Sequence, residues 1–214
     1  MSGEEVTRAQ KAPRRRYRKR RRAELEEHTR QQITEAAVRL HGSVGPARTT
    51  VSAVAREAGV QRSTVYRHFP TDVALFEACS QHWLSLNPPP DPGTWSGIAD
   101  PAERLRAALA ELYEWYGWAE PMLVNTTRDA PLVPAMAKPA RAFRTFLEEV
   151  HAALMSGRPE RGRRRHRVAA AIGLGLAFTT WRSLTREAGL DDDEAVALMA
   201  AAAQGAGRTR QASA

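Results

Sequence analysis

Hydrophobic positions between residues 49 and 69 predict two short helices joined by a tight turn. Apolar side chains recur there at the spacing of one helical face: Val51, Val54, Ala55 and Ala58. The hydroxyl of Thr50 can cap the first helix by accepting an unpaired backbone N–H. Gly59 follows, and glycine enters the left-handed conformation at little steric cost. Val60 is apolar where a loop is usually polar, so we expect it to fill the angle between the helices.

The second helix of the pair, from residue 61 or 62 to residue 68, has few side chains to bury. Only Val65 and Phe69 are apolar at helical spacing, and Pro70 disfavours helical geometry at the residue before it. The other positions offer hydrogen bonds: Gln61, Arg62, Ser63, Thr64, Tyr66, Arg67 and His68. A helix in the major groove of DNA needs this composition, because polar groups reach base edges and phosphates there. An amphipathic surface helix is the alternative.

The same periodicity predicts helices along the rest of the chain, over residues 23–41, 71–86, 101–119, 136–155, 163–187 and 191–204, with a short helix opening at Pro121. We therefore expect an all-α fold of about nine helices. Residues 87–100 are rich in proline and glycine, and are expected to connect an N-terminal helix-turn-helix domain, residues 23–86, to a C-terminal helical domain, residues 101–205. We expect residues 206–214 to be a disordered tail.

Positive charge gathers before the first of these helices. Residues 8–22 hold ten basic side chains and no acidic one, and without them the formal net charge of +8 becomes −2. We expect residues 1–22 to be a disordered arm, because a run of like charges repels itself. Its densest part is a candidate for tracking phosphates or entering the minor groove: Arg14, Arg15, Arg16, Arg18, Lys19, Arg20, Arg21 and Arg22. A solvated or nonspecific polyanion-binding tail is the alternative.

Residues 29–76 resemble the DNA-binding domain of the TetR family of transcriptional regulators. The resemblance is carried by an Ala-Ala-x-x-Leu helix, Thr-Thr before the second helix, Ala-x-x-Ala-Gly-Val, Ser-Thr-Val-Tyr-x-His-Phe, and Ala-Leu-Phe. Two positions depart from the family's pattern. His41 stands where an aromatic residue is usual, so we expect looser packing there. Asp72 replaces a basic residue that usually touches a phosphate, so we expect no such contact from it.

The resemblance implies a homodimer that binds double-stranded DNA at an imperfect inverted repeat, as a repressor released by a small, largely apolar effector. It implies a DNA-contacting set: Thr49, Thr50, Gln61, Arg62, Ser63, Thr64, Tyr66, Arg67 and His68. By their chemistry, Gln61 and Arg62 are expected to read bases. The phosphates are expected to be held by Thr50, Tyr66, Arg67 and His68.

The C-terminal domain carries two further expectations. The helix over residues 163–187 is apolar nearly all round at its centre, which indicates burial on every side. The resemblance implies that it joins the last helix in a dimer interface, with these candidates: Ala170, Gly173, Gly175, Val196 and Met199. It also implies an effector pocket, with these candidates: Trp115, Trp118, Met122, Asn125, Thr126, Phe143, Phe146, Phe178 and Trp181. Ordinary core packing within one chain is the alternative for both sets.

The sequence contains few motifs that would indicate another class of function. We expect no enzyme, because no carboxylate pair, nucleophile motif or glycine-rich phosphate loop is present. We expect no metal or cofactor, because Cys79 and His82 are two ligands at most. A single cysteine suits the cytoplasm, no signal peptide is expected, and the apolar run 168–178 is too short to span a membrane. A nonspecific architectural DNA-binding protein without a ligand remains the alternative function.

Overall fold

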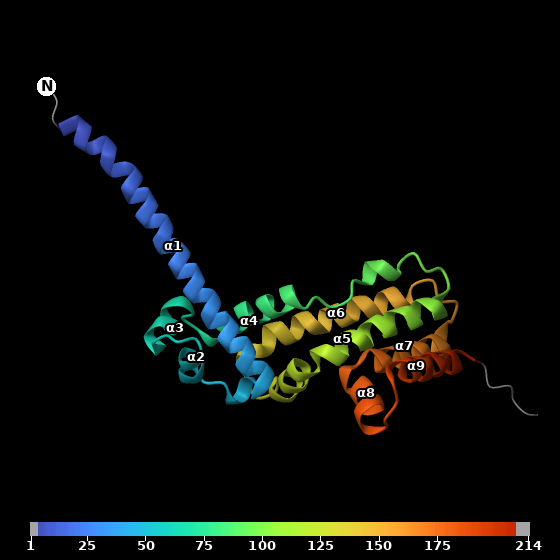
Figure 1. Cartoon of the computed structure of the whole chain (residues 1–214). Coiled ribbons are helices and arrows are strands. Elements are labelled where there is room, and N and C mark those ends of the chain that lie inside the picture. The colour runs from blue at the N-terminus through green and yellow to red at the C-terminus, as the bar shows by residue number, and fades with distance from the viewer. Residues whose placement is uncertain (1–3, 209–214) are drawn as a thin grey trace, which may run out of the picture.

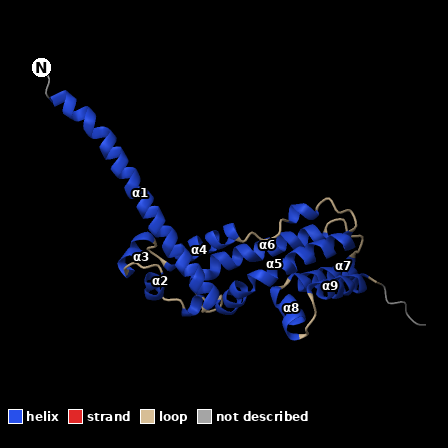
Figure 2. Ribbon diagram, viewed as in Figure 1, coloured by secondary structure: helices blue, strands red, loops and turns tan. Residues whose placement is uncertain are grey.

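The computed structural model describes residues 4–208, with side chains from residue 16, and this part contains helices and no strand (Figures 1 and 2). Nine α-helices follow one another in it: α1 Glu4–Ser43, α2 Val51–Glu57, α3 Arg62–His68, α4 Asp72–Leu86, α5 Pro101–Asp129, α6 Ala137–Met155, α7 Gly162–Leu176, α8 Phe178–Arg182 and α9 Asp192–Gly207. Short 3-10 helices cover Pro46–Arg48, Pro92–Trp95 and Pro134–Met136, and Ser183–Glu187 is π-helical. The expected all-α fold is confirmed.

The second half of α1 packs with α2, α3 and α4 around a small core. Its i, i+3, i+4 residues Ile33, Ala36 and Ala37 are fully buried, as their spacing predicts. The other helices contribute fewer side chains to this core: Val54, Ala55, Val65, Phe69, Leu75 and Cys79. Because α3 supplies only Val65, with Phe69 directly after it, most of α3 is left for solvent.

Helix α1 begins at Glu4, inside the region that we expected to be disordered, and projects as a rod beyond the N-terminal domain (Figure 1). The packed turns after residue 30 provide a nucleus from which a helix extends at low cost. Arginine, lysine, glutamate and alanine all favour that extension. Two i, i+4 ion pairs offset part of the repulsion within the arm by about 0.3–0.5 kcal/mol each: Arg20–Glu24 at 3.2 Å and Arg22–Glu26 at 3.0 Å.

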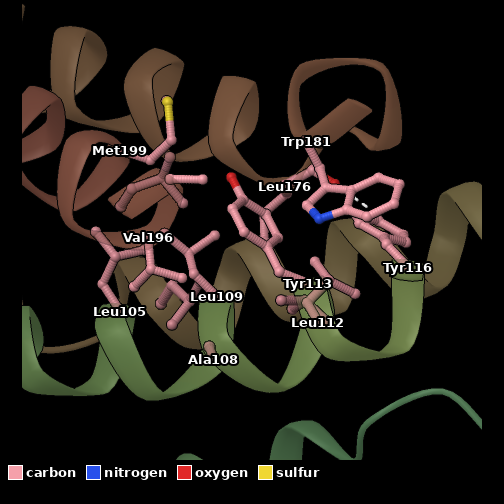
Figure 3. Close-up of a cluster of buried hydrophobic side chains, with 14 of the residues drawn as sticks. Leu105, Ala108, Leu109, Leu112, Tyr113, Tyr116, Leu176, Trp181, Val196 and Met199 are labelled. Atoms are coloured by element: carbon pink, nitrogen blue, oxygen red, sulfur yellow. Dashed lines mark hydrogen bonds between the residues drawn. The ribbon is translucent and has the colours of Figure 1, made fainter. Parts of the chain in front are cut away.

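The C-terminal core is built on α5, whose apolar stripe faces α7, α8 and α9 (Figure 3). Five large side chains of this stripe are at most 2% exposed: Leu105, Leu109, Leu112, Tyr113 and Tyr116. Leu176 of α7, Trp181 of α8, and Val196 and Met199 of α9 close over them. Asp191 begins α9 by accepting the N–H of Glu194, whose side chain accepts the N–H of Asp191 in return.

Helices α5 and α7 also end at positions other than those expected. Helix α5 continues through Pro121 to Asp129, because the residues beyond the proline are held by packing that offsets one lost backbone hydrogen bond. The expected helix over residues 163–187 instead breaks at Ala177. There the hydroxyls of Tyr113 and Tyr116 donate to the carbonyls of Gly175 and Leu176, at 2.9 and 2.6 Å. These bonds satisfy acceptors that the end of α7 would otherwise leave unpaired.

The segment between the domains is docked on the protein. Trp95, in its 3-10 helix, is 1% exposed and belongs to the C-terminal core. At the other end of the chain, α9 extends to Gly207, two residues into the expected tail, and residues 209–214 lie outside the described part.

Candidate DNA-binding surface and internal cavity

Helices α2 and α3 are joined as the sequence predicts. The Thr50 hydroxyl accepts the N–H of Ala53 at 3.1 Å and so caps α2. Gly59 has a φ of 67°, and the N–H of Val60 bonds to the carbonyl of Ala55 at 2.9 Å. This is the hydrogen-bond pattern of a helix end closed by a left-handed glycine. It fixes the angle at which α3 leaves α2.

Helix α3 presents a polar surface. Gln61, Arg62, Ser63, Tyr66 and Arg67 are exposed. Of the remaining candidates for DNA contact, Thr50 is exposed, and three are half-buried: Thr49, Thr64 and His68. The two threonines before α2 are already engaged, since one hydroxyl caps α2 and that of Thr49 donates to the carbonyl of Gly45 at 2.8 Å.

Arg62 is held along the outer face of α3. Its Nη2 donates to the hydroxyl of Tyr66 at 3.0 Å, and its guanidinium carbon lies 5.4 Å from the centre of the Tyr66 ring. Both side chains are one helical turn apart and exposed. The arginine is therefore pre-positioned at the surface, with donors still free to form a bidentate contact.

The end of α3 is fixed by Arg30, a residue of α1 that the sequence analysis missed. Its Nη1 donates to the carbonyl of His68 at 2.9 Å, and its guanidinium carbon lies 4.2 Å from the centre of the Phe69 ring. Arg30 thus satisfies a carbonyl that α3 leaves unpaired at its end. No local signal marks it, because 38 residues separate the two partners.

The basic arm lies on the projecting part of α1. Side chains from Arg16 to Arg22 are exposed, whereas those of Arg14 and Arg15 lie outside the described part. Asp72, at the first turn of α4, is exposed as well, and Thr71 caps that helix. The structure thus leaves the arm open to a large partner.

A cavity of about 380 Å³ lies between the two domains. Five of the candidate effector contacts line it: Trp115, Met122, Thr126, Phe143 and Phe146. The N-terminal domain supplies much of the rest of the wall: Val38, His41, Pro46, Phe76, Glu77, Cys79, Ser80, Gln81, Trp83 and Leu84. The cavity therefore spans the joint between the domains instead of lying within the second domain alone.

The other four candidates for effector contact do not line this cavity. Phe178 and Trp181 are buried in the C-terminal core, where the indole N–H of Trp181 donates to Asp192 at 2.8 Å. Trp118 is 49% exposed at the surface. Asn125 is buried, and its amide donates to the carbonyl of Gly42 at 2.8 Å, so it connects the domains.

His41 packs as an aromatic residue, which corrects the expectation of looser packing. Its ring stacks on that of Phe76, with centroids 4.7 Å apart and planes 6° apart. Burial lowers the pKa of His41 to about 4, although the carboxylate of Asp129 acts in the opposite direction. Burial also raises the pKa of the Cys79 thiol to about 12. Both side chains are uncharged at neutral pH.

A second set of polar contacts ties the loop after α1 to the end of α5. The N–H of Ala47 donates to the Asp129 carboxylate at 2.9 Å. Arg128 pairs with the same carboxylate at 2.6 Å and donates to the carbonyl of Val44. The side-chain hydrogen bond from Arg128 is the main reason why the pKa of Asp129 lies below its ordinary value. These contacts hold the end of α5 against the loop that precedes α2.

The candidates for a dimer interface separate into two groups. Gly175, Val196 and Met199 lie in the core of the chain itself, and a Cβ on Gly175 would already meet Leu109 and Met199 at 3.5 Å. Ala170 and Gly173 are exposed. They continue into an exposed, largely apolar face across α7 and α9, which the sequence analysis did not fully identify: Leu174, Leu198, Ala201 and Ala202.

The described residues lack two features that would indicate another kind of function. No helix in this part is both long and apolar enough to cross a membrane. No cluster of three or more His, Cys, Asp or Glu side chains forms a potential metal site there.

Helices α2 and α3, with the turn between them, form a helix-turn-helix motif, and this motif places the protein in the class of helix-turn-helix proteins. Residues 33–79 match the model of the family described as bacterial regulatory proteins, tetR family. The chain is also 38% identical over 82 residues to the HTH-type transcriptional regulator SrpR of Pseudomonas putida, a match that covers 36% of this chain and 38% of that protein. The likeness to the TetR family therefore rests on the DNA-binding domain.

Solved structures extend the likeness to the whole fold. A TetR-like transcriptional regulator from Rhodococcus is 22% identical, with a TM-score of 0.56 over 82% of this chain and 93% of that one. NalD, the secondary repressor of the MexAB-OprM multidrug efflux pump in Pseudomonas aeruginosa, is 21% identical, with a TM-score of 0.58 over 88% and 99%. At these identities, the similarity establishes the fold only.

Proposed function

We propose that the protein is a transcriptional repressor that binds an inverted-repeat DNA operator as a homodimer and releases it when a small, largely apolar effector fills the interdomain cavity. The observation that carries the proposal is α3, which buries Val65 and, together with its N-cap Gln61, exposes five polar side chains. A helix with so little packing surface is suited to the major groove. Selection of bound sequences from a random DNA pool tests it, and enrichment of no motif would contradict it.

Base reading is assigned to Arg62 and Gln61. Arg62→Ala should relax discrimination at one base position by about 1–3 kcal/mol, because a bidentate contact to guanine is lost. Arg106→Ala on α5 removes the same charge away from α3 and is the matched control. An unchanged base preference across a site library would contradict the role of Arg62.

The arm on α1 is proposed to bind phosphates beside the operator. Deleting residues 1–22 removes ten basic side chains, and should weaken binding at all sequences and flatten the salt dependence of the affinity. The projection of the helix beyond the N-terminal domain supports this role (Figure 1). Equal salt slopes for the full chain and the truncated protein would contradict it.

The homodimer is proposed to form through the exposed face of α7 and α9. Leu174 is 57% exposed and Leu198 49% exposed, and two helices from each of two chains would bury them in a four-helix bundle. A twofold axis would place the α3 helices about 34 Å apart, one turn of DNA. Leu198→Lys should give a monomer by sedimentation, whereas Leu132→Lys, at a position 69% exposed elsewhere, should not. A monomeric wild type at micromolar concentration would contradict the proposal.

Effector response is proposed to pass from the cavity to α3 through α1, α4 and the contacts of Asn125 and Asp129. The effector must bind the arrangement that cannot hold DNA more tightly than the one that can. A screen for molecules that release the selected operator tests this. Molecules that fill the cavity without changing DNA affinity would contradict it.

A nonspecific architectural role is favoured only by the density of positive charge in residues 14–22. Footprinting separates the two functions. A repressor protects a defined palindrome, whereas an architectural protein covers DNA diffusely.

A further inference from the structure

We infer that the cavity selects an effector that is uncharged as well as aromatic. The inference rests on the proposed function of the cavity and concerns its charge selectivity. It follows from the way in which the charged groups of the wall are arranged. Each of them is already neutralised by a neighbour, so none is left to meet a charge on a ligand.

Aromatic rings from both domains form part of the wall. Trp115 lies between Trp83 of α4 and Phe143 of α6, with ring centroids 6.0 Å apart in each pair. Phe143 is followed at 6.0 Å by Phe146. A flat apolar molecule can contact these ring faces and exclude water from them.

Only two lining residues are charged, and they pair with each other. Lys138 of α6 lies 2.9 Å from Glu77 of α4, and their side chains are 71% and 31% exposed. The pair therefore lies at the rim and adds no net charge. Asp129, the carboxylate that acts on His41, is engaged by Arg128.

The remaining polar groups of the wall are neutral. His41 and Cys79 carry no charge at neutral pH. The Thr126 hydroxyl donates to the carbonyl of Met122 at 2.8 Å, so it can only accept from a ligand. An ionised ligand would lose its hydration here without gaining an opposite charge, and such a transfer is strongly unfavourable.

A matched pair of probes tests the inference on the full-length protein. N-phenyl-1-naphthylamine is uncharged, and 8-anilino-1-naphthalenesulfonate has the same ring system with one sulfonate. Binding of the uncharged probe is followed by its fluorescence, and the sulfonate is added as a competitor. The measurement therefore follows displacement from the cavity, and does not count sulfonate that binds to the basic arm. We expect the sulfonate to compete at least about tenfold more weakly than the uncharged compound binds.

Four variants test whether the wall of the cavity causes the difference in affinity between the probes. Glu77→Gln leaves Lys138 without its partner, so the difference in affinity between the two probes should become smaller. Lys138→Met removes the positive charge, so this difference in affinity should become larger. Glu111→Gln makes the same charge change at an exposed position of α5 outside the wall, and should leave the difference unchanged. Ser80→Phe places a ring in the cavity and should weaken binding of the uncharged probe.

Competition by the sulfonate at equal or lower concentration would overturn the inference, as would an unchanged difference in Glu77→Gln. Failure of the uncharged probe to bind, or an unchanged affinity in Ser80→Phe, would overturn both the inference and the proposed effector site. Binding of the uncharged probe without release of DNA would count against the proposed regulation alone and leave the charge selectivity supported.

Discussion

Acid should destabilise the protein through His41, and replacing this residue with phenylalanine should remove the effect. His41 is 5% exposed and stacks on Phe76. Its pKa is about 4 in the folded chain, against an ordinary value of 6.5. Between these values, the unfolded chain binds a proton that the folded chain does not. The free energy of unfolding is therefore unaffected well above pH 6.5 and falls as the pH is lowered towards 4.

The magnitude follows from the difference between the two pKa values. Each pH unit in this window costs about 1.4 kcal/mol, so lowering the pH from 7 to 4 should cost about 3 kcal/mol. That is a large part of the roughly 5–15 kcal/mol that holds a typical domain folded. The lowered pKa of Asp129 does not interfere, because its contribution is present above its ordinary pKa of 3.8 and is lost below that value.

Urea unfolding of the wild type and of His41→Phe at pH 7.5, 6.5, 5.5 and 4.5 measures the effect. Phenylalanine keeps an aromatic ring on Phe76 but cannot bind a proton, and the other histidines are present in both proteins. The difference in unfolding free energy between the proteins should therefore change by about 1.4 kcal/mol per pH unit below 6.5. If the unfolding free energies of the two proteins run parallel across this pH range, His41 is not the source of the acid sensitivity.

Three further substitutions test the contacts around the helix-turn-helix. Arg30→Met removes the hydrogen bond to the His68 carbonyl, so it should lower the free energy of unfolding by about 1–3 kcal/mol and weaken DNA binding. The control Arg39→Met breaks only an exposed ion pair with Glu57 and should lower the free energy of unfolding by less than about 1 kcal/mol. Asp129→Ala should cost about 1.5–3 kcal/mol and speed amide exchange around Ala47, and Asp129→Asn should cost less because an oxygen acceptor remains. Gly59→Ala should cost about 1–2 kcal/mol, from backbone strain alone, since a Cβ there meets no atom within 4 Å. Equal unfolding free energies of variant and wild type would contradict each expectation.

The helix-turn-helix could be predicted because its signals are local. Thr50, Gly59 and Pro70 each act within a few residues of the boundary they set. The shortage of apolar residues in α3 likewise follows directly from the sequence, and the structure leaves those polar side chains exposed. By contrast, the repulsion within residues 14–22 pointed to disorder, since the contribution of the packed half of α1 is not visible in that stretch.

Local signals in the sequence were enough to predict the two helices of the helix-turn-helix and the polar face of α3, because capping, spacing and turn chemistry act over one or two helical turns. The end of α7, by contrast, depends on contacts between distant segments, since the tyrosines that bond its last carbonyls lie about 60 residues away. It also decided that the cavity opens between the domains, with His41 in its wall and Asn125 turned to Gly42. The spacing of apolar residues predicts that a side chain is buried, but the packing of the helices sets which side chains it contacts.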